Sequence, residues 1–175
     1  MIRVAHINEY KRVLDFYYQL IDDMEGMEYH PKWQKGVYPD PAELRIALEN
    51  AELFIDEEEN EVISAMRVNH DVTDGYDKVA WAVDADKEHV TVIHMLGVAA
   101  SHQGKGIAKK MVQFVIDKAG SERQNAIRLD VLVGNIPANR LYESMGFEYR
   151  ERITLYYEDT GFTDFDLYEM VLFSE

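Results

Sequence analysis

Cysteine is absent from the 175-residue chain. Its absence excludes disulfides, iron–sulfur and zinc-ribbon sites, and thiol-based catalysis. Long apolar runs are absent too, because none approaches the roughly 20 residues that span a bilayer. Charges interrupt the opening stretch MIRVAHINEY before a signal-peptide core can form. We therefore expect a soluble, cytoplasmic protein with no membrane partner.

Positive charge is scarce. The chain has 18 Lys and Arg against 33 Asp and Glu, which gives a net charge of −15. A field of that sign disfavours nonspecific binding to nucleic acid and mildly attracts cations such as amines. Part of the charge lies in the run DEEENE at 56–61, which predicts a solvated turn. Solubility is the simpler explanation for the remaining charge.

Repeats, low-complexity segments and linkers are also missing, and 47% of the residues are apolar. This composition predicts one globular domain over residues 1–175. Hydrophobic spacing and capping residues predict helices over 8–24, 41–49 and 104–119, the third ending at Gly120, and a short helix between Pro137 and Gly146. Strands are predicted over 2–5, 51–55, 61–68, 90–98, 126–133, 147–156 and 165–173, whereas 76–83 is left open. The order indicates a mixed α/β domain with a β-α-β-α-β core over 90–156.

The stretch ASHQGKGIAKK at 100–110 joins a predicted strand to a predicted helix. Without a Cβ, Gly104 and Gly106 let a ligand approach the backbone closely. The unpaired N–H groups at the start of the helix favour an anion, most often a phosphate. The spacing does not fit a Walker loop, and Lys109 occupies the position of the third glycine of a dinucleotide fingerprint. A purely structural turn is the alternative.

The wider context of this turn is specific. The segment Gln103-Gly104-Lys105-Gly106-Ile107-Ala108 fits Q/R-x-x-G-x-G/A, the pyrophosphate loop of the GNAT superfamily of acetyl-CoA-dependent N-acetyltransferases. Downstream, NIPANRLYESMGF at 135–147 resembles the N-x-x-A-x-x-L-Y-x-x-x-G-F signature of that family. The resemblance is strong over 90–156. It is weaker over 1–89, where W-x-x-G-x-Y-P at 33–39 looks like bacterial members of uncertain substrate.

The resemblance implies an α/β (α+β) acyl-CoA N-acyltransferase fold. Its mixed sheet has about six to seven strands, splayed between the fourth and fifth, with about four flanking helices. Residues 1–89 would form the N-terminal, acceptor-side part, 90–156 the acetyl-CoA-binding core, and 157–175 the C-terminal strand. Members of the family often form homodimers, so a homodimer is an open expectation.

The resemblance also implies how acetyl-CoA binds. The pantetheine arm would lie between 90–98 and 126–133 and pair with the backbone of Leu96 and Val98. The N–H of Leu96 would polarise the thioester carbonyl. Asn135 and Asn139 would contact the cosubstrate from the other side. The pyrophosphate would bind the amides of the loop formed by Gln103, Gly104, Lys105, Gly106, Ile107, Ala108 and Lys109.

Two side chains are candidates for proton transfer. Tyr142 matches the family's tyrosine near the sulfur and would act as general acid; packing of the short helix is the alternative. His94 matches a strand histidine of arylalkylamine N-acetyltransferases. If side chains alternate along the strand, we expect it on the same face as Leu96, and a pKa of about 6.5 would suit a proton relay. A histidine hydrogen-bonded within the sheet is the alternative. Because the family's commoner glutamate is replaced by Val92, a water relay also stays open.

In this family the acceptor site is built from the N-terminal helices, the loop between them and the last hairpin. Aromatic rings near acidic groups suit an ammonium group, although core packing would explain most of them equally well. The candidates are Tyr29, Trp33, Tyr38, Trp81, Phe165, Tyr168 and Glu169. The remaining histidines show no metal-binding spacing, so we expect no metal.

The main hypothesis is an N-acetyltransferase that moves the acetyl group to a primary amine of a small molecule in a ternary complex. A protein lysine or N-terminal acetyltransferase is the alternative within the enzyme class. A non-catalytic acetyl-CoA-binding sensor is the alternative outside it, and would keep the loop but lose the acid and the base.

Overall fold

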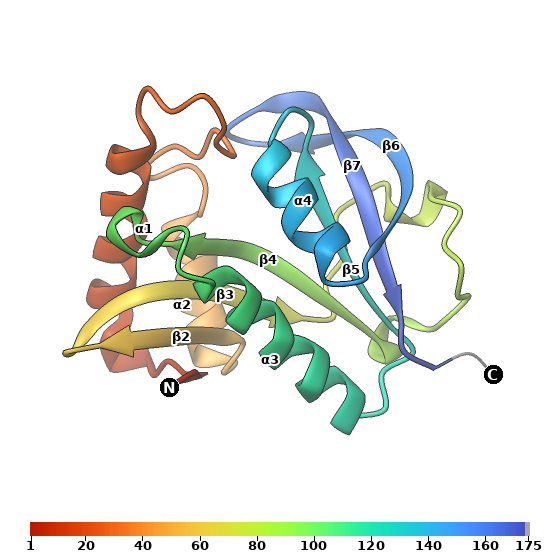
Figure 1. Ribbon diagram of the computed structural model, residues 1–175, viewed down its shortest axis with the longest axis horizontal. Helices are drawn as coiled ribbons and strands as arrows, with labels where there is room; N and C mark the ends of the chain where they lie inside the picture. Colours follow the sequence, from red (N-terminus) through yellow and green to blue (C-terminus); the bar gives the residue numbers. More distant parts are fainter. Residues whose placement is uncertain (174–175) are drawn as a thin grey trace.

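The computed structural model describes residues 1–173 and has a single central sheet (Figure 1). Its strands are β1 (Arg3–Val4), β2 (Leu53–Glu58), β3 (Glu61–Asn69), β4 (Val90–Val98), β5 (Ala126–Leu132), β6 (Glu148–Tyr157) and β7 (Gly161–Val171). The helices are α1 (Tyr10–Met24), α2 (Pro41–Glu49), α3 (Ile107–Ser121) and α4 (Ile136–Ser144). Short 3-10 turns lie at Ile7–Glu9, Tyr76–Lys78, Lys87–His89 and Ala100–His102. The segment left open at 76–83 is thus a turn followed by irregular chain.

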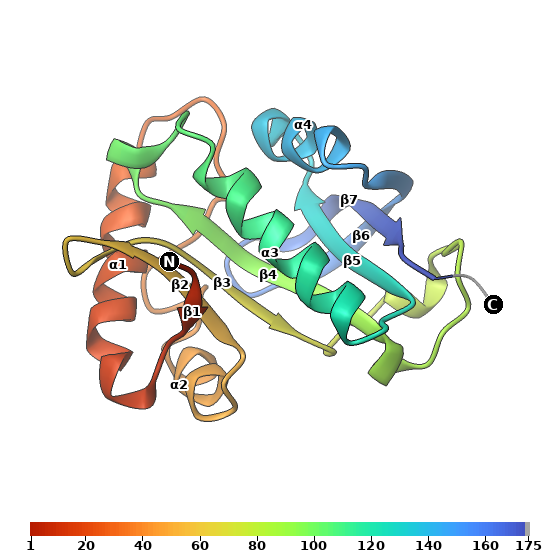
Figure 2. The ribbon, with the colours of Figure 1, turned by 60° about the horizontal axis from the view of Figure 1, so that its bottom comes forward.

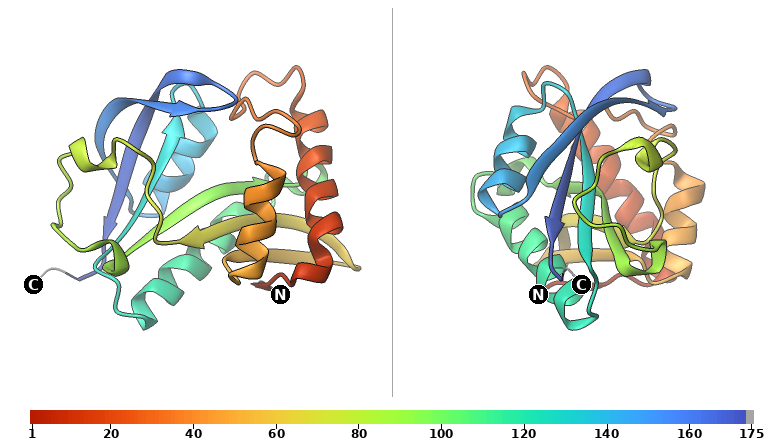
Figure 3. Two further views of the ribbon diagram at one scale, coloured as in Figure 1. Left: turned by 180° about the vertical axis from the view of Figure 1, so that it is seen from behind. Right: turned by 90° about the vertical axis from the view of Figure 1, so that its right-hand side faces the viewer.

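The helices cover both faces of the sheet. Helices α1 and α2 pack on one face, and α3 and α4 lie on the other (Figures 2 and 3). Met111, Val112 and Val115 of α3 are fully buried against the sheet. On the opposite face, Tyr17 and Leu20 of α1 pack with Leu44 of α2. The periodic apolar positions of the sequence therefore predict which side of each helix meets the sheet.

The strand order is β1-β2-β3-β4-β5-β7-β6. Strands β4 and β5 are parallel, and their pairing runs from Val90 with Ala126 only as far as Val92 with Arg128. Beyond these pairs the two strands part, and a gap opens between the second half of β4 and the second half of β5. The predicted fold class is confirmed, including the splay between the fourth and fifth strands.

A β-bulge interrupts β4 at the edge of this gap. The pairing of β3 with β4 shifts register between Ala65 and Arg67, and Met95 has φ 55°. Such a bulge ends the strict alternation of side chains along a strand. Met95 packs with the α1 and α2 cluster, whereas Leu96 packs with the α3 cluster on the other face.

Two helix boundaries differ in detail from the prediction. Helix α2 begins as expected, with the Asp40 carboxylate accepting the Ala42 N–H at 2.7 Å. Helix α3 begins at Ile107 and not at 104, because Gly104 and Gly106 have φ of 74° and 82° and so belong to the preceding turn. The helix also runs past Gly120, which keeps a helical conformation, and ends at Ser121. Among residues 1–173, no helix combines the length and the apolar character needed to cross a membrane.

Candidate active site

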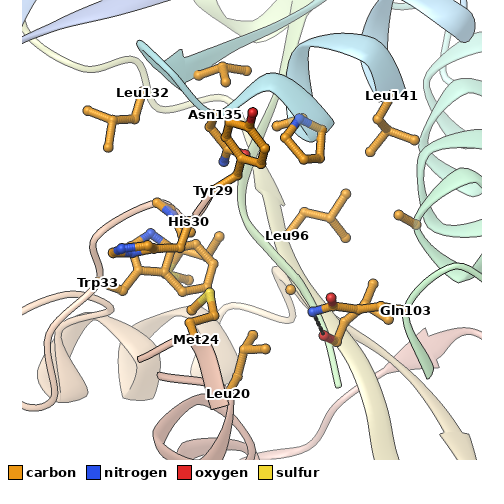
Figure 4. Close-up of a pocket in the computed structure, with 18 of the residues that line it drawn as sticks. Leu20, Met24, Tyr29, His30, Trp33, Leu96, Gln103, Leu132, Asn135 and Leu141 are labelled. Carbon is orange, nitrogen blue, oxygen red and sulfur yellow. Dashed lines mark hydrogen bonds between the residues drawn. The ribbon is translucent and has the colours of Figure 1, made fainter. Parts of the chain in front are cut away.

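The gap between β4 and β5 opens into a cavity of about 750 Å³. Its walls come from α1, the segment 27–38, the second half of β4, the loop 102–109, the end of β5, α4 and the β6–β7 turn. Figure 4 shows Met24, His30 and Trp33 on one side of it, Leu132, Asn135 and Leu141 on the other, and Leu96 between them. Segments distant in the sequence thus meet where the sheet splits.

The loop before α3 forms one end of the cavity. A Cβ built on Gly104 or Gly106 would have no heavy atom within 4 Å, so open space faces both glycines. The first helical hydrogen bond runs from the Lys110 N–H to the Gly106 carbonyl, which leaves the preceding N–H groups of the helix free for an anion. Gln103 Nε2 donates to the Val98 carbonyl at 3.2 Å and fixes the loop to β4 (Figure 4). All predicted loop residues line the cavity except Lys105, which is exposed.

The second half of β4 forms the floor of the cavity. Both Leu96 and Val98 line it. Gly97 between them has no room for a side chain, because a Cβ there would lie 2.4 Å from Leu20 Cδ2 and 3.5 Å from Trp33. Helix α1 and the Trp33 ring therefore pack directly on the strand and close one side of the cavity.

Tyr142 of α4 lines the cavity from the α3 and α4 face. Its ring packs edge-on against Phe147 at 5.5 Å and beside Tyr168 at 6.5 Å. Burial raises the pKa of the Tyr142 phenol well above its ordinary value, and the charge of Asp130 raises it further. The hydroxyl is therefore protonated at neutral pH, the state that a general acid requires.

His94 departs from the prediction in the face of the sheet that it occupies. The bulge at Met95 puts Leu96 with the α3 cluster, whereas His94 Nε2 lies 3.0 Å from Asn69 Oδ1 on the opposite face of the sheet. Burial, helped by the nearby Arg67 charge, lowers the His94 pKa to about 4. The expected shared face is wrong, and the lowered pKa does not suit a proton relay near neutral pH. At neutral pH the imidazole is uncharged and hydrogen-bonded within the sheet.

A half-buried acid that the sequence interpretation missed faces the same cavity. Asp130 lies on β5, just beyond Arg128, the last residue paired with β4. Its Oδ2 accepts hydrogen bonds from the hydroxyls of Tyr76 at 2.6 Å and Tyr157 at 2.9 Å. Burial raises the Asp130 pKa, and the two phenols oppose that shift in part. The available signal was a carboxylate between Leu129 and Val131 near the end of a strand.

Of the predicted acceptor-side residues, four line the cavity and three lie outside its lining. Tyr29, Trp33, Tyr38 and Phe165 line the cavity. The ring of Tyr38 lies 6.2 Å from Trp33 and 5.4 Å from Tyr157, so the aromatic groups form a continuous wall.

Three other predicted acceptor residues lie outside the cavity lining. Trp81 stacks on the Arg128 guanidinium at 4.4 Å. Tyr168 packs beside α4 and donates to Glu143. The fully buried Glu169 pairs with Arg128 and Arg150, both at 3.0 Å, and also accepts the Ala82 N–H. Its predicted contact with the acceptor is wrong, because these partners fix it inside the sheet.

Of the two asparagines in the motif at 135–147, one lines the cavity and the other does not. Asn135 lines the cavity. Asn139 lies outside the lining, and its Nδ2 donates to Asp166 Oδ2 at 3.1 Å, which ties α4 to β7. The predicted contact of the Asn139 side chain with acetyl-CoA is therefore not supported by its position. Over residues 1–173, no three histidine or acidic side chains gather closely enough to hold a metal ion.

Comparison with known proteins shows similarity both in sequence and in fold. The model of the acetyltransferase (GNAT) family matches residues 15–147. N-alpha-acetyltransferase 30 of Saccharomyces cerevisiae is 40% identical over 80 residues, which cover 46% of this chain and 43% of the yeast protein. The chain thus spans less than half the length of this curated relative.

Solved structures of lower identity share the whole fold. A GNAT-family acetyltransferase from Streptococcus agalactiae superimposes with a TM-score of 0.81 at 16% identity, covering 99% of this chain and 96% of that one. The protein yncA of Salmonella typhimurium, solved with its cofactor acetyl-CoA, has a TM-score of 0.72 at 16% identity and covers 100% of this chain and 95% of its own.

Proposed function

The chain belongs to the acetyltransferase (GNAT) family, and from this premise we propose that it moves the acetyl group of acetyl-CoA to a primary amine of a small molecule. The observation that carries the proposal is the shared cavity. An anion-binding loop, the open backbone of β4, a protonated phenol and a half-buried carboxylate all line the same space.

Acetyl-CoA, as the cosubstrate, would supply the activated acetyl group. The amides of the loop at 103–109 would bind its pyrophosphate, since they combine free N–H groups with glycines that leave room for an anion. The gap between β4 and β5 would hold the pantetheine arm, with Leu96 and Val98 offering backbone groups. The Leu96 N–H would stabilise the negative charge that develops on the thioester oxygen.

The proposed reaction is a direct attack in a ternary complex. The amine nitrogen forms a bond to the carbonyl carbon, and the carbon–sulfur bond breaks. Asp130 takes the proton that the amine loses, because its carboxylate lies on β5 where the strands part and its pKa is raised by burial. The Tyr142 hydroxyl gives a proton to the departing sulfur. His94 is less suited to the role of base, because its pKa of about 4 makes it a weak proton acceptor.

A small acceptor is favoured by the way the cavity is covered. Gln34 Nε2 donates to the Asp159 carbonyl at 2.7 Å and joins the segment 27–39 to the β6–β7 turn. Figure 1 shows this segment reaching across to the tip of the hairpin of β6 and β7. A peptide would need an open groove at this place, and the bridge crosses it.

A protein N-terminus is the second candidate acceptor, favoured by the similarity to the yeast N-alpha-acetyltransferase 30. The matched segment covers 46% of this chain, so it bears on the cosubstrate side more than on the acceptor side. For a peptide to enter, the Gln34–Asp159 bridge would have to open.

Calorimetric titration with acetyl-CoA is the first test. We expect micromolar binding by the wild type and its loss in Gly106→Glu, which adds a negative charge at the loop. Gly26→Glu is the matched control, because Gly26 is also exposed, has φ 80° with no atom near its missing Cβ, and lies outside the cavity lining. No binding by the wild type, or equal loss in both variants, would contradict the proposed loop.

A thiol-release screen of small amines and short peptides follows. Release with small amines supports the main proposal, and release with peptides alone supports the second candidate. Acetyl-CoA binding without release on any acceptor would indicate a non-catalytic sensor.

A further inference from the structure

A second carboxylate faces the acceptor side of the cavity and has no role in the reaction described above. Asp159 lies in the turn between β6 and β7 and lines the cavity. Its Oδ1 is buried and has no hydrogen-bond partner in the protein. Within residues 1–173, no lysine, arginine or histidine nitrogen lies within 4.0 Å of this carboxylate. Burial raises the pKa of this carboxyl, and backbone N–H groups of Asp159 and Thr160 offset that shift only in part. A buried carboxylate oxygen without a partner is unfavourable, and a positive group entering the cavity would satisfy it.

The position of this turn is fixed. The backbone carbonyl of Asp159 accepts the hydrogen bond from Gln34 that joins the hairpin to the segment 27–39. Two residues earlier, the Tyr157 hydroxyl donates to Asp130, the proposed proton acceptor. The hydrogen bond from Tyr157 therefore ties the end of β6, next to the turn that carries Asp159, to Asp130 on β5.

The Tyr38 phenol lies near both carboxylates. Burial raises the pKa of its phenol, and the charges of Asp130 and Asp159 raise it further, so both carboxylates act on the same hydroxyl. Its ring packs between Trp33 and Tyr157. The surface that joins the two acids is therefore aromatic, which suits both a cation and a short hydrocarbon chain.

We infer that Asp159 binds a second ammonium group, and that the acceptor is a diamine with an apolar linker. The inference rests on the proposed function. One amino group would lie at Asp130, lose its proton and react. The other would stay protonated at Asp159, and the linker would lie along Tyr38, Tyr157 and Phe165. The net charge of −15 favours the approach of such a dication.

The test compares amines of equal chain length. Putrescine and cadaverine are assayed by thiol release beside butylamine and pentylamine. We expect kcat/KM to be about 10-fold or more higher for the diamines, the scale of one charged hydrogen bond. Asp159→Asn should lower kcat/KM about 10-fold more for the diamines than for the monoamines. Glu158→Gln is the matched control: it removes the same charge from the neighbouring residue, which is exposed and outside the cavity lining, and should keep the preference.

Calorimetry adds a readout that does not depend on turnover. Putrescine titrated into the protein saturated with CoA should bind more weakly to Asp159→Asn than to Glu158→Gln. Equal kcat/KM for diamines and monoamines, or a similar loss for both in Asp159→Asn, would overturn the inference and leave the proposed acetyl transfer standing. Acetyl-CoA binding with no thiol release from any amine would overturn both.

Discussion

Replacing Asp130 by asparagine is the sharpest test of the proposed proton route. The substitution keeps the size of the side chain and an oxygen that can accept a hydrogen bond from Tyr76 or Tyr157. It removes the group that can take a proton. We expect kcat/KM to fall while the affinity for acetyl-CoA stays unchanged, because Asp130 lies on the face of the sheet opposite to the Tyr142 side of the cavity.

The size of the effect follows from the chemistry of the amine. An alkyl amine has a pKa of about 10.4, so its deprotonation at pH 7 requires about 4–5 kcal/mol. A positioned base typically contributes about 100- to 10,000-fold to the rate. We expect a loss of about 100-fold, at the lower end of that range, because the retained oxygen can still orient a water molecule.

We expect that Asp130→Asn does not destabilise the folded protein at pH 7, so a loss of kcat/KM can be assigned to the proton route. Burial raises the folded-state pKa of Asp130 above its unfolded value. The folded state therefore binds the proton more tightly, and Asp130 contributes stability at low pH that is lost as the pH rises past the unfolded pKa of about 3.9. At pH 7 the wild type has already lost this contribution to stability, so the asparagine variant loses nothing by lacking the carboxyl group. We expect its Tm to be equal to or above that of the wild type.

The assay is thiol release from acetyl-CoA with a fixed amine, measured across pH. In the wild type, kcat/KM should fall on acidification as Asp130 takes up a proton, with a midpoint above the ordinary aspartate pKa. This fall of kcat/KM at low pH should be absent in Asp130→Asn. Tyr157→Phe, which removes one hydrogen bond and keeps the base, should cost about 10-fold at most. An unchanged kcat/KM and pH profile in Asp130→Asn would refute the assignment.

Three other predictions test the neighbouring residues. Tyr142→Phe should lower kcat about 100-fold with little change in acetyl-CoA affinity; equal turnover, measured by thiol release, would remove the general acid. His94 has a folded pKa of about 4, below its unfolded value, so the wild type should lose about 3 kcal/mol of stability between pH 6.5 and pH 4. Urea denaturation should find this loss absent in His94→Gln. Glu169→Gln leaves Arg128 and Arg150 without their buried partner and should lower the free energy of unfolding by about 3 kcal/mol, whereas a stable variant in urea would contradict the structural role.

The fold could be predicted because local patterns and a resemblance agreed. Apolar periodicity located the helices, and Asp40 with Pro41 marked the start of α2. The start of α3 was predicted three residues too early, because a pattern of apolar residues does not show that Gly104 and Gly106 adopt positive φ. The splay between β4 and β5 was expected from the resemblance alone, and the pairing of β5 with β7 was not predicted, since no local signal joins them.

The site could be predicted only in part. Loop and strand residues near the glycines were found because their function depends on backbone that the motif specifies. The face of His94 was missed because the bulge at Met95, a left-handed residue that is not glycine, leaves no mark in the sequence. Asp130 and Glu169 look alike in the sequence, each an acid flanked by apolar residues within a strand. Their roles differ because Glu169 meets Arg128 and Arg150 from neighbouring strands, whereas Asp130 meets two phenols and a cavity.

The two proposed proton-transfer groups are coupled through their charges. The Asp130 carboxylate raises the pKa of Tyr142, and so keeps the phenol protonated before the reaction. When Asp130 takes the proton of the amine, its charge disappears and that contribution to the Tyr142 pKa disappears with it. Tyr142 then becomes a stronger acid at the moment the sulfur departs. Because each group depends on the other, the rate losses in Asp130→Asn and Tyr142→Phe should be less than additive in the double variant, and full additivity would mean that the two residues act independently.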